Sequence, residues 1–189
     1  MAGAEIRNAA YVTGAYALAF SVVAWIVAPI QTLFLPEVTI FAALIFPPHG
    51  VRVFSAWLFG PRAVFYLFVA DLTCHFLLTP ELPLGIKTVA AWGIQSVCAP
   101  LAFAILRSLG RNYQTMTAEP DRYTWRRLMV VGFVSSILNS LGHNLLFAGE
   151  IWPIGSFKVF VAFLIGDTLG TFVAFAALML LLRTLRRFA

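Results

Sequence analysis

Charged residues are scarce in this sequence: they make up 11% of its 189 residues, whereas soluble domains carry about a quarter. Long polar stretches are also missing, since the longest, residues 110–127, is too short to bury a hydrophobic core of its own. Apolar residues make up 61% of the chain, and its mean hydropathy is +0.89. The sequence therefore excludes an ordinary soluble domain and predicts a single transmembrane domain over residues 1–189.

Cysteine and catalytic motifs are equally sparse. Cys74 and Cys98 both lie in apolar segments, which leaves no disulfide framework and no metal-ligand spacing such as CxxC. The three histidines show no such spacing either, so we expect no metal site. There is no nucleophile with a neighbouring base and no phosphate-binding glycine loop, which argues against an enzyme. No particular cofactor is indicated.

Six candidate membrane spans appear when the apolar runs are cut at polar, proline and glycine clusters. The N-terminal run is interpreted as the first span rather than as a signal peptide, because no clear small-residue cleavage site follows it. We predict an all-α bundle with a main loop at residues 110–127. The predicted spans are residues 9–30, 38–59, 63–78, 86–109, 128–147 and 157–182.

The basic residues predict the orientation of these spans, because Lys and Arg collect at cytoplasmic ends. With the N-terminus inside, both termini are cytoplasmic, and that side receives Arg7, Arg62, Arg107, Arg111, Arg122, Arg126, Arg127, Arg183, Arg186 and Arg187. The opposite side receives only Lys87 and Lys158. The net charge of +5 is therefore a topology signal with attraction to the lipid bilayer, and no nucleic-acid partner is expected.

Three charged residues fall near the middle of predicted spans: Arg52, Asp71 and Asp167. An unpaired charge at that depth costs about 2.5–3.5 kcal/mol, so we expect partners. A tight turn at residues 59–63 makes Arg52 and Asp71 the first pair to expect, because it places them at similar distances on antiparallel neighbours. Asp167 then needs either the other face of the Arg52 guanidinium or a protonated carboxyl group.

Two prolines interrupt the second predicted span, within the stretch FPPHGVRVF (residues 46–54). Pro47 and Pro48 remove two backbone donors and leave the carbonyls of Ala43 and Leu44 without helical partners. Backbone freed at membrane depth must be buried in protein or line a wet cavity. We therefore predict that this span is broken into two half-helices.

The second half-helix is expected to begin near His49 or Gly50, with partial positive charge on its N-terminal amides. Arg52 in the first turn adds to that field, so an aspartate of another span or an anionic ligand should lie close. A simple proline kink without a ligand is the alternative. The candidate site comprises Pro47, Pro48, His49, Gly50, Arg52, Asp71, Asn139, His143, Gly166, Asp167 and Gly170.

Two motifs resemble the first class of membrane-associated sensor domains, which precede histidine kinases and diguanylate cyclases in bacteria. They are FPPHGVRVFSAWLFGPRAVFYLFVAD and IGDTLGTFVAFAALMLLLR. In that family a Pro and Gly motif opens a short helix that leads to a Gly-Arg-like turn, and Gly-Asp-x-x-Gly lies in a late span. The matching positions are Pro47, Pro48, Gly50, Arg52, Gly60, Arg62, Gly166, Asp167 and Gly170.

The resemblance implies a sensor module in a bacterial inner membrane. Such domains commonly have more spans and a cytoplasmic output domain, whereas this sequence stops at Ala189. We therefore expect it to act through a partner membrane protein or as a subunit of a larger assembly. The leading hypothesis is a non-enzymatic module that binds a ligand or a partner through a polar mid-membrane site.

Three other possibilities stay open. The chain could be the substrate-binding component of a transporter, an accessory subunit of a respiratory or photosynthetic complex, or an intramembrane enzyme. In addition, the buried charges could serve only as contacts that hold a broken helix in place, rather than as a ligand pocket or a proton relay.

Overall fold

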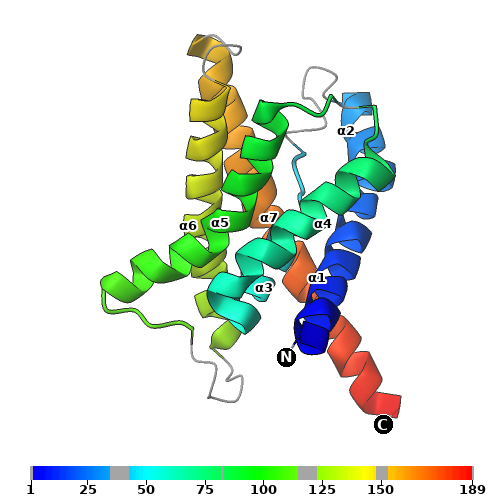
Figure 1. Cartoon of the computed structure of the whole chain (residues 1–189), viewed down its shortest axis with the longest axis vertical. Helices are drawn as coiled ribbons and strands as arrows, with labels where there is room; N and C mark the ends of the chain where they lie inside the picture. The colour runs from blue at the N-terminus through cyan, green and yellow to red at the C-terminus, as the bar shows by residue number, and fades with distance from the viewer. Residues whose placement is uncertain (1, 35–42, 82, 115–122, 148–152, 189) are drawn as a thin grey trace.

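The computed structural model of the chain describes residues 2–34, 43–81, 83–114, 123–147 and 153–188, which form helices and no strand (Figure 1). The elements are α1 (Ala2–Val22), the π-helix η1 (Val23–Val27), α2 (Ala28–Phe34), α3 (Pro48–Phe59), the 3₁₀-helix η3 (Gly60–Arg62), α4 (Ala63–Leu78), α5 (Ile86–Ser108), α6 (Thr124–Leu146) and α7 (Pro153–Phe188).

Five helical stretches among the described residues are long and apolar enough to cross a membrane: Gly3–Phe34, Pro48–Leu78, Ile86–Ser108, Thr124–Leu146 and Phe160–Arg187. Their outer faces carry large apolar side chains. Trp25, Leu33 and Leu145, for example, are between 71% and 79% exposed. Exposed apolar side chains in such number suit a lipid environment rather than water. The all-helical, multi-pass prediction is therefore confirmed, whereas the count of six separate spans is not.

The difference in count arises because α3, η3 and α4 follow one another without a break. This stretch is nevertheless not a single rod. Asp71 lies 19 positions after Arg52, which a straight helix would separate by about 28 Å. Arg52 Nη2 is only 3.9 Å from Asp71 Oδ1. The chain therefore folds back at η3, where Gly60 has a φ of 59°.

α4 (Ala63–Leu78) coincides with a predicted span, whereas other helices extend beyond theirs. The first helical stretch covers residues 2–34 rather than 9–30, and α7 covers Pro153–Phe188 rather than 157–182. Likewise, α6 begins at Thr124, so the end of the predicted 110–127 loop is helical; residues 115–122 lie outside the described part. Hydropathy marks only the lipid-buried part of a helix, and a helix can continue through the headgroup region.

The segment before α3 differs in detail from two half-helices. Residues 43–47 are not helical, and residues 38–42 of the second predicted span lie outside the described residues. α3 begins at Pro48, with Pro47 as its N-cap. Proline suits this position because the first amides of a helix have no helical acceptor in any case.

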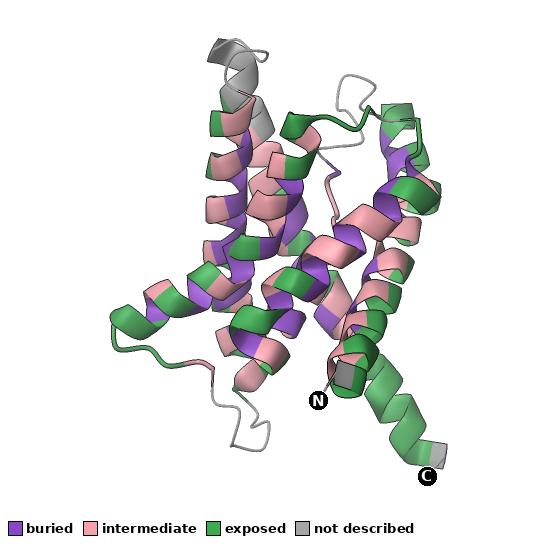
Figure 2. Ribbon diagram, in the orientation of Figure 1, coloured by how far each residue is buried: buried purple, intermediate pink, exposed green. Residues whose placement is uncertain are grey.

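α3 lies at the centre of the bundle and contacts α1, α4, α5, α6 and α7. Small residues allow this close approach, since the side chains of Ala56, Ala63, Ala70 and Ala99 are fully buried. Figure 2 shows buried residues along the faces that the helices turn toward one another.

One end of the bundle gathers four features: the first turn of α1, the η3 turn, residues 109–114 and the last turn of α7 (Figure 1). Glu5 joins the first two, because Arg62 Nη1 donates to Glu5 Oε1 at 3.1 Å and the Tyr66 hydroxyl donates to Glu5 Oε2.

Candidate functional site

The segment that leads into α3 lies directly against the backbone of α7. The Phe46 amide donates to the Gly166 carbonyl at 2.9 Å. A Cβ atom on Gly166 would come closer than 3.0 Å to the Ala43 carbonyl oxygen, and one on Gly170 would come as close to the backbone of Phe46. Both glycines are therefore required by close backbone approach, and the two motifs singled out in the sequence lie in contact.

A glutamine of the first helical stretch accepts a hydrogen bond from a second backbone amide of the non-helical segment 43–47. Gln31, on α2, is buried, and its Oε1 accepts a hydrogen bond from the Leu44 amide at 2.8 Å. Sequence reasoning did not include Gln31. A buried amide side chain supplies the acceptor that a helical carbonyl would otherwise provide.

Arg52, in the first turn of α3, is 1% exposed and lies among side chains of three other helices. Its Nη2 donates to the Tyr16 hydroxyl of α1 and to Gln95 Oε1 of α5. The Tyr16 hydroxyl in turn donates to Asp71 Oδ1 at 2.6 Å. The guanidinium also lies 5.3 Å from the centre of the Phe46 ring. Tyr16 therefore bridges the arginine and the aspartate.

His49, three positions before Arg52 in α3, faces the second buried aspartate and is fully buried. Its Nδ1 is 3.3 Å from Asp167 Oδ2, and its Nε2 is 3.3 Å from the Gly132 carbonyl oxygen. Asn139 Nδ2 donates to Asp167 Oδ2 at 2.7 Å. Asp167 thus makes its contacts with His49 and Asn139, rather than with the second face of the Arg52 guanidinium.

Gln95 and His143 connect the contacts around Arg52 with those around Asp167. Gln95 Nε2 lies 3.2 Å from His143 Nε2, and His143 Nδ1 lies 2.9 Å from the Asn139 carbonyl oxygen. Because the carbonyl can only accept, Nδ1 carries the proton and Nε2 accepts from the Gln95 amide. The resulting set, called the polar core below, consists of Tyr16, His49, Arg52, Asp71, Gln95, Asn139, His143 and Asp167, with contributions from α1, α3, α4, α5, α6 and α7.

Several polar atoms of the polar core have no hydrogen-bond partner among the described residues. They are His49 Nδ1, whose approach to Asp167 lacks hydrogen-bond geometry, Arg52 Nε, Asp71 Oδ2 and Asn139 Oδ1. The hydroxyls of Ser135 and Ser140, on α6 beside Asn139, share this property. A buried polar atom left in this state costs about 1–3 kcal/mol.

The structure thus gathers the predicted site residues in one region, although in different roles. Pro47 and Pro48 start α3, and Gly50 packs against Ala174 of α7. His75, one of the three histidines, lies apart from the polar core and packs on Trp92, with ring centres 5.2 Å apart.

Sequence reasoning missed the role of Tyr16, which lies within the first predicted span, residues 9–30. Its signal was present, because a tyrosine in mid-span needs a partner for its hydroxyl.

Among the described residues, no three His, Cys, Asp or Glu side chains gather closely enough to hold a metal ion. Cys74 and Cys98 are buried and free. Comparison of the chain with protein-family models, with curated proteins and with solved structures finds no match.

Proposed function

We propose that the chain is a non-enzymatic membrane module of the sensor-domain type, which binds a ligand or a partner membrane protein at the polar core. In this proposal it crosses a bacterial inner membrane six times. The second crossing is residues 38–59, broken at Pro47–Pro48, and both termini are cytoplasmic. The reversal of the chain at η3 supports two crossings, before and after this turn, where the helices form one continuous stretch. The first turn of α1 and the last turn of α7 lie at the same end of the bundle, which supports termini on the same side of the membrane (Figure 1).

The observation that carries the proposal is the convergence of six helices on charged side chains whose hydrogen-bonding capacity is only partly used. Contacts that merely held the helices together would be most stable if fully paired. Polar atoms without partners in an apolar bundle are costly, and ionisable residues kept at membrane depth mark binding sites or pathways. The N-terminal end of α3 adds partial positive charge at the same place.

A second feature supports a sensor in particular. α3 is 12 residues long, about 18 Å, and both its ends are held. Its first turn carries His49 and Arg52 in the polar core. Near its other end, the Ala56 carbonyl accepts a hydrogen bond from Gln114 Nε2 at 3.0 Å. A displacement of α3 at the polar core would therefore reach the loop at the proposed cytoplasmic side.

Native mass spectrometry of the gently extracted full chain tests the proposal. We expect a bound mass, or a membrane protein at fixed stoichiometry, that is lost in Arg52→Gln and in Asp167→Asn. Arg62→Gln is the matched control, because it also removes one arginine charge but at a side chain that is 72% exposed.

Recovery of wild-type protein with nothing bound would contradict the proposal and leave the polar core as a purely structural contact. Copurified ATPase subunits would instead indicate a transporter component, and a large respiratory or photosynthetic complex would indicate an accessory subunit.

A further inference from the structure

The C-terminal turns of α7 lie outside the packed bundle. Among the side chains of α7 that the structure describes, the last buried one is Phe175, and every residue from Met179 to Arg187 is exposed. Figure 2 shows these turns projecting beyond the other helices. Their side chains are therefore available for contacts that the bundle itself does not make.

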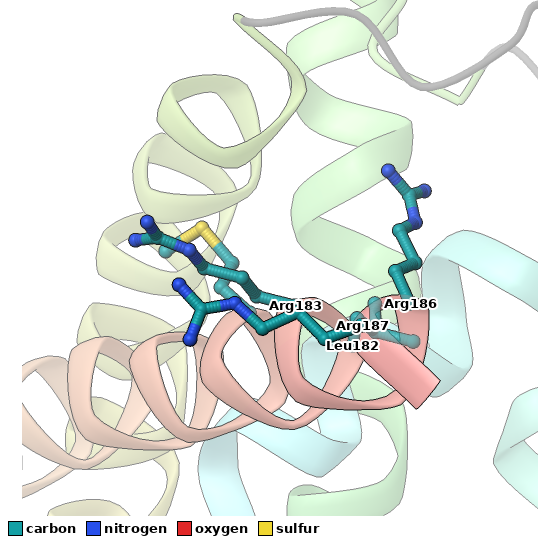
Figure 3. A pocket seen from close by; sticks show the side chains of 5 residues that line it. Leu182, Arg183, Arg186 and Arg187 are labelled. Atoms are coloured by element: carbon teal, nitrogen blue, oxygen red, sulfur yellow. The ribbon is translucent and has the colours of Figure 1, made fainter. Parts of the chain in front are cut away.

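The side chains of this segment separate into two faces. At 100° per residue, Met179, Arg183, Arg186 and Arg187 fall within about 100° of one another, and Leu181 and Leu185 fall on the other side. Figure 3 shows the side chains of Arg183 and Arg187 reaching in the same direction and that of Arg186 reaching away from them. A shallow hollow of about 450 Å³ follows this face and is lined by Met179, Leu182, Arg183, Arg186 and Arg187.

Clustered arginines on one face repel each other. Arg183 is three positions before Arg186 and four before Arg187, the two spacings at which like charges on a helix destabilise it. Among the described residues, the carboxylates in ion pairs are Glu5, Asp71 and Asp167, none of which pairs with these arginines. The topology rule accounts for positive charge at this end but not for its collection on a single face. An anion is the expected partner.

The sequence of α7 indicates where that anion lies. The helix has 36 residues, about 54 Å, so it is long enough to cross a bilayer that is about 40–45 Å thick with its headgroup regions. Residues 172–182 are all apolar, and the three arginines follow within the next five residues. Because arginine is costly in the hydrocarbon region and collects at helix ends, the arginines are expected at headgroup level, with Met179 and Leu182 toward the acyl chains.

We propose that Arg183 and Arg187 bind the phosphate group of an anionic phospholipid, with its acyl chain against Met179 and Leu182. The planar fork of a guanidinium donates two parallel hydrogen bonds to phosphate oxygens, which a lysine ammonium does not. This site is separate from the polar core and does not depend on the function proposed for it.

Native mass spectrometry of the full chain in mild detergent, titrated with palmitoyl-oleoyl phosphatidylglycerol or with phosphatidylcholine of the same chains, tests the site. We expect wild type to prefer phosphatidylglycerol. Arg183→Gln with Arg187→Gln should weaken that binding about 25-fold, because each arginine near an anionic surface contributes about fivefold. The charge-preserving pair Arg183→Lys with Arg187→Lys should fall in between.

The matched control is Arg107→Gln with Arg111→Gln, two exposed arginines with the same four-residue spacing at the same end of the bundle. An equal loss in this control would show that only overall charge matters, and would overturn the proposal. So would a wild type that binds both lipids alike, or displacement of phosphatidylglycerol by an equal concentration of inorganic phosphate. Circular dichroism of each variant checks that the fold is retained.

Discussion

Replacing Gly170 with alanine probes the contact between residues 43–46 and α7. The added Cβ would lie within 3.0 Å of the backbone nitrogen, carbon and oxygen of Phe46. Carbon atoms in van der Waals contact are about 3.5–4.0 Å apart, so the two backbones must separate by at least about 0.5 Å. Because the contacted atoms belong to the backbone, no side-chain rotation can relieve the clash. Pro47 also restricts the backbone conformation of Phe46.

The cost of this substitution follows from two contributions. Overpacking a tight interior costs about 1–3 kcal/mol. Separation of the backbones also weakens the hydrogen bond from the Phe46 amide to the Gly166 carbonyl, which is worth about 1 kcal/mol. The free energy of unfolding should therefore fall by about 2–4 kcal/mol. For chains of 150–250 residues this corresponds to a decrease in Tm of about 4–16 °C.

The chain carries its own reporters for this measurement. Cys74 and Cys98 are free thiols, 3% and 5% exposed, so a thiol-reactive fluorophore in mild detergent labels them only as the bundle unfolds. Gly14→Ala is the matched control, because its added Cβ would meet nothing within 4 Å. If Gly170→Ala unfolds at the same temperature as this control, residues 43–46 do not pack on α7 as described, and the position of α3 is wrong.

The same thermal assay tests the arginine side of the polar core. Arg52→Met should cost about 3–5 kcal/mol because it leaves Asp71 as an uncompensated buried charge, and adding Asp71→Asn should recover about 0.5–3 kcal/mol of that loss. A double variant as unstable as the sum of the singles would refute the pairing. Tyr16→Phe should cost about 1–3 kcal/mol, because it removes the hydroxyl that bridges Arg52 and Asp71. The control Tyr11→Phe, at a side chain that is 67% exposed, should change stability by less than about 0.5 kcal/mol. Equal effects of the two substitutions would rule out the bridge.

The proximity of Arg52 and Asp71 followed from the sequence because a three-residue turn fixes the register of the two helices it joins. Their distances from that turn, counted along each helix, then place them at the same level. Local chain geometry was sufficient for this pair. It required no knowledge of how the remaining helices are arranged.

The partners of His49, Asp167 and Tyr16 depend instead on helices that are distant in sequence. Apolar periodicity carries little information in a membrane bundle, since lipid-facing and core-facing positions are both apolar. Which face of α1 or α6 turns inward is therefore hidden until the helices are packed. The count of five long helical stretches, against six predicted spans, has a local cause. A helical turn at Gly60 joins two segments that hydropathy separates at polar and glycine positions, so residues 48–78 form one stretch that folds back on itself.

The packing of residues 43–46 against α7 has a consequence for biogenesis. Phe46 precedes Gly166 by 120 positions, and ribosomes add about 5–20 residues per second. After their own synthesis, the Phe46 amide and His49 therefore wait about 6–24 s for Gly166 and Asp167 to be added. Tyr16, Asp71 and Gln95 are available to Arg52 well before that. The earlier helices therefore enter the membrane with an incomplete polar interior, and α7 completes it.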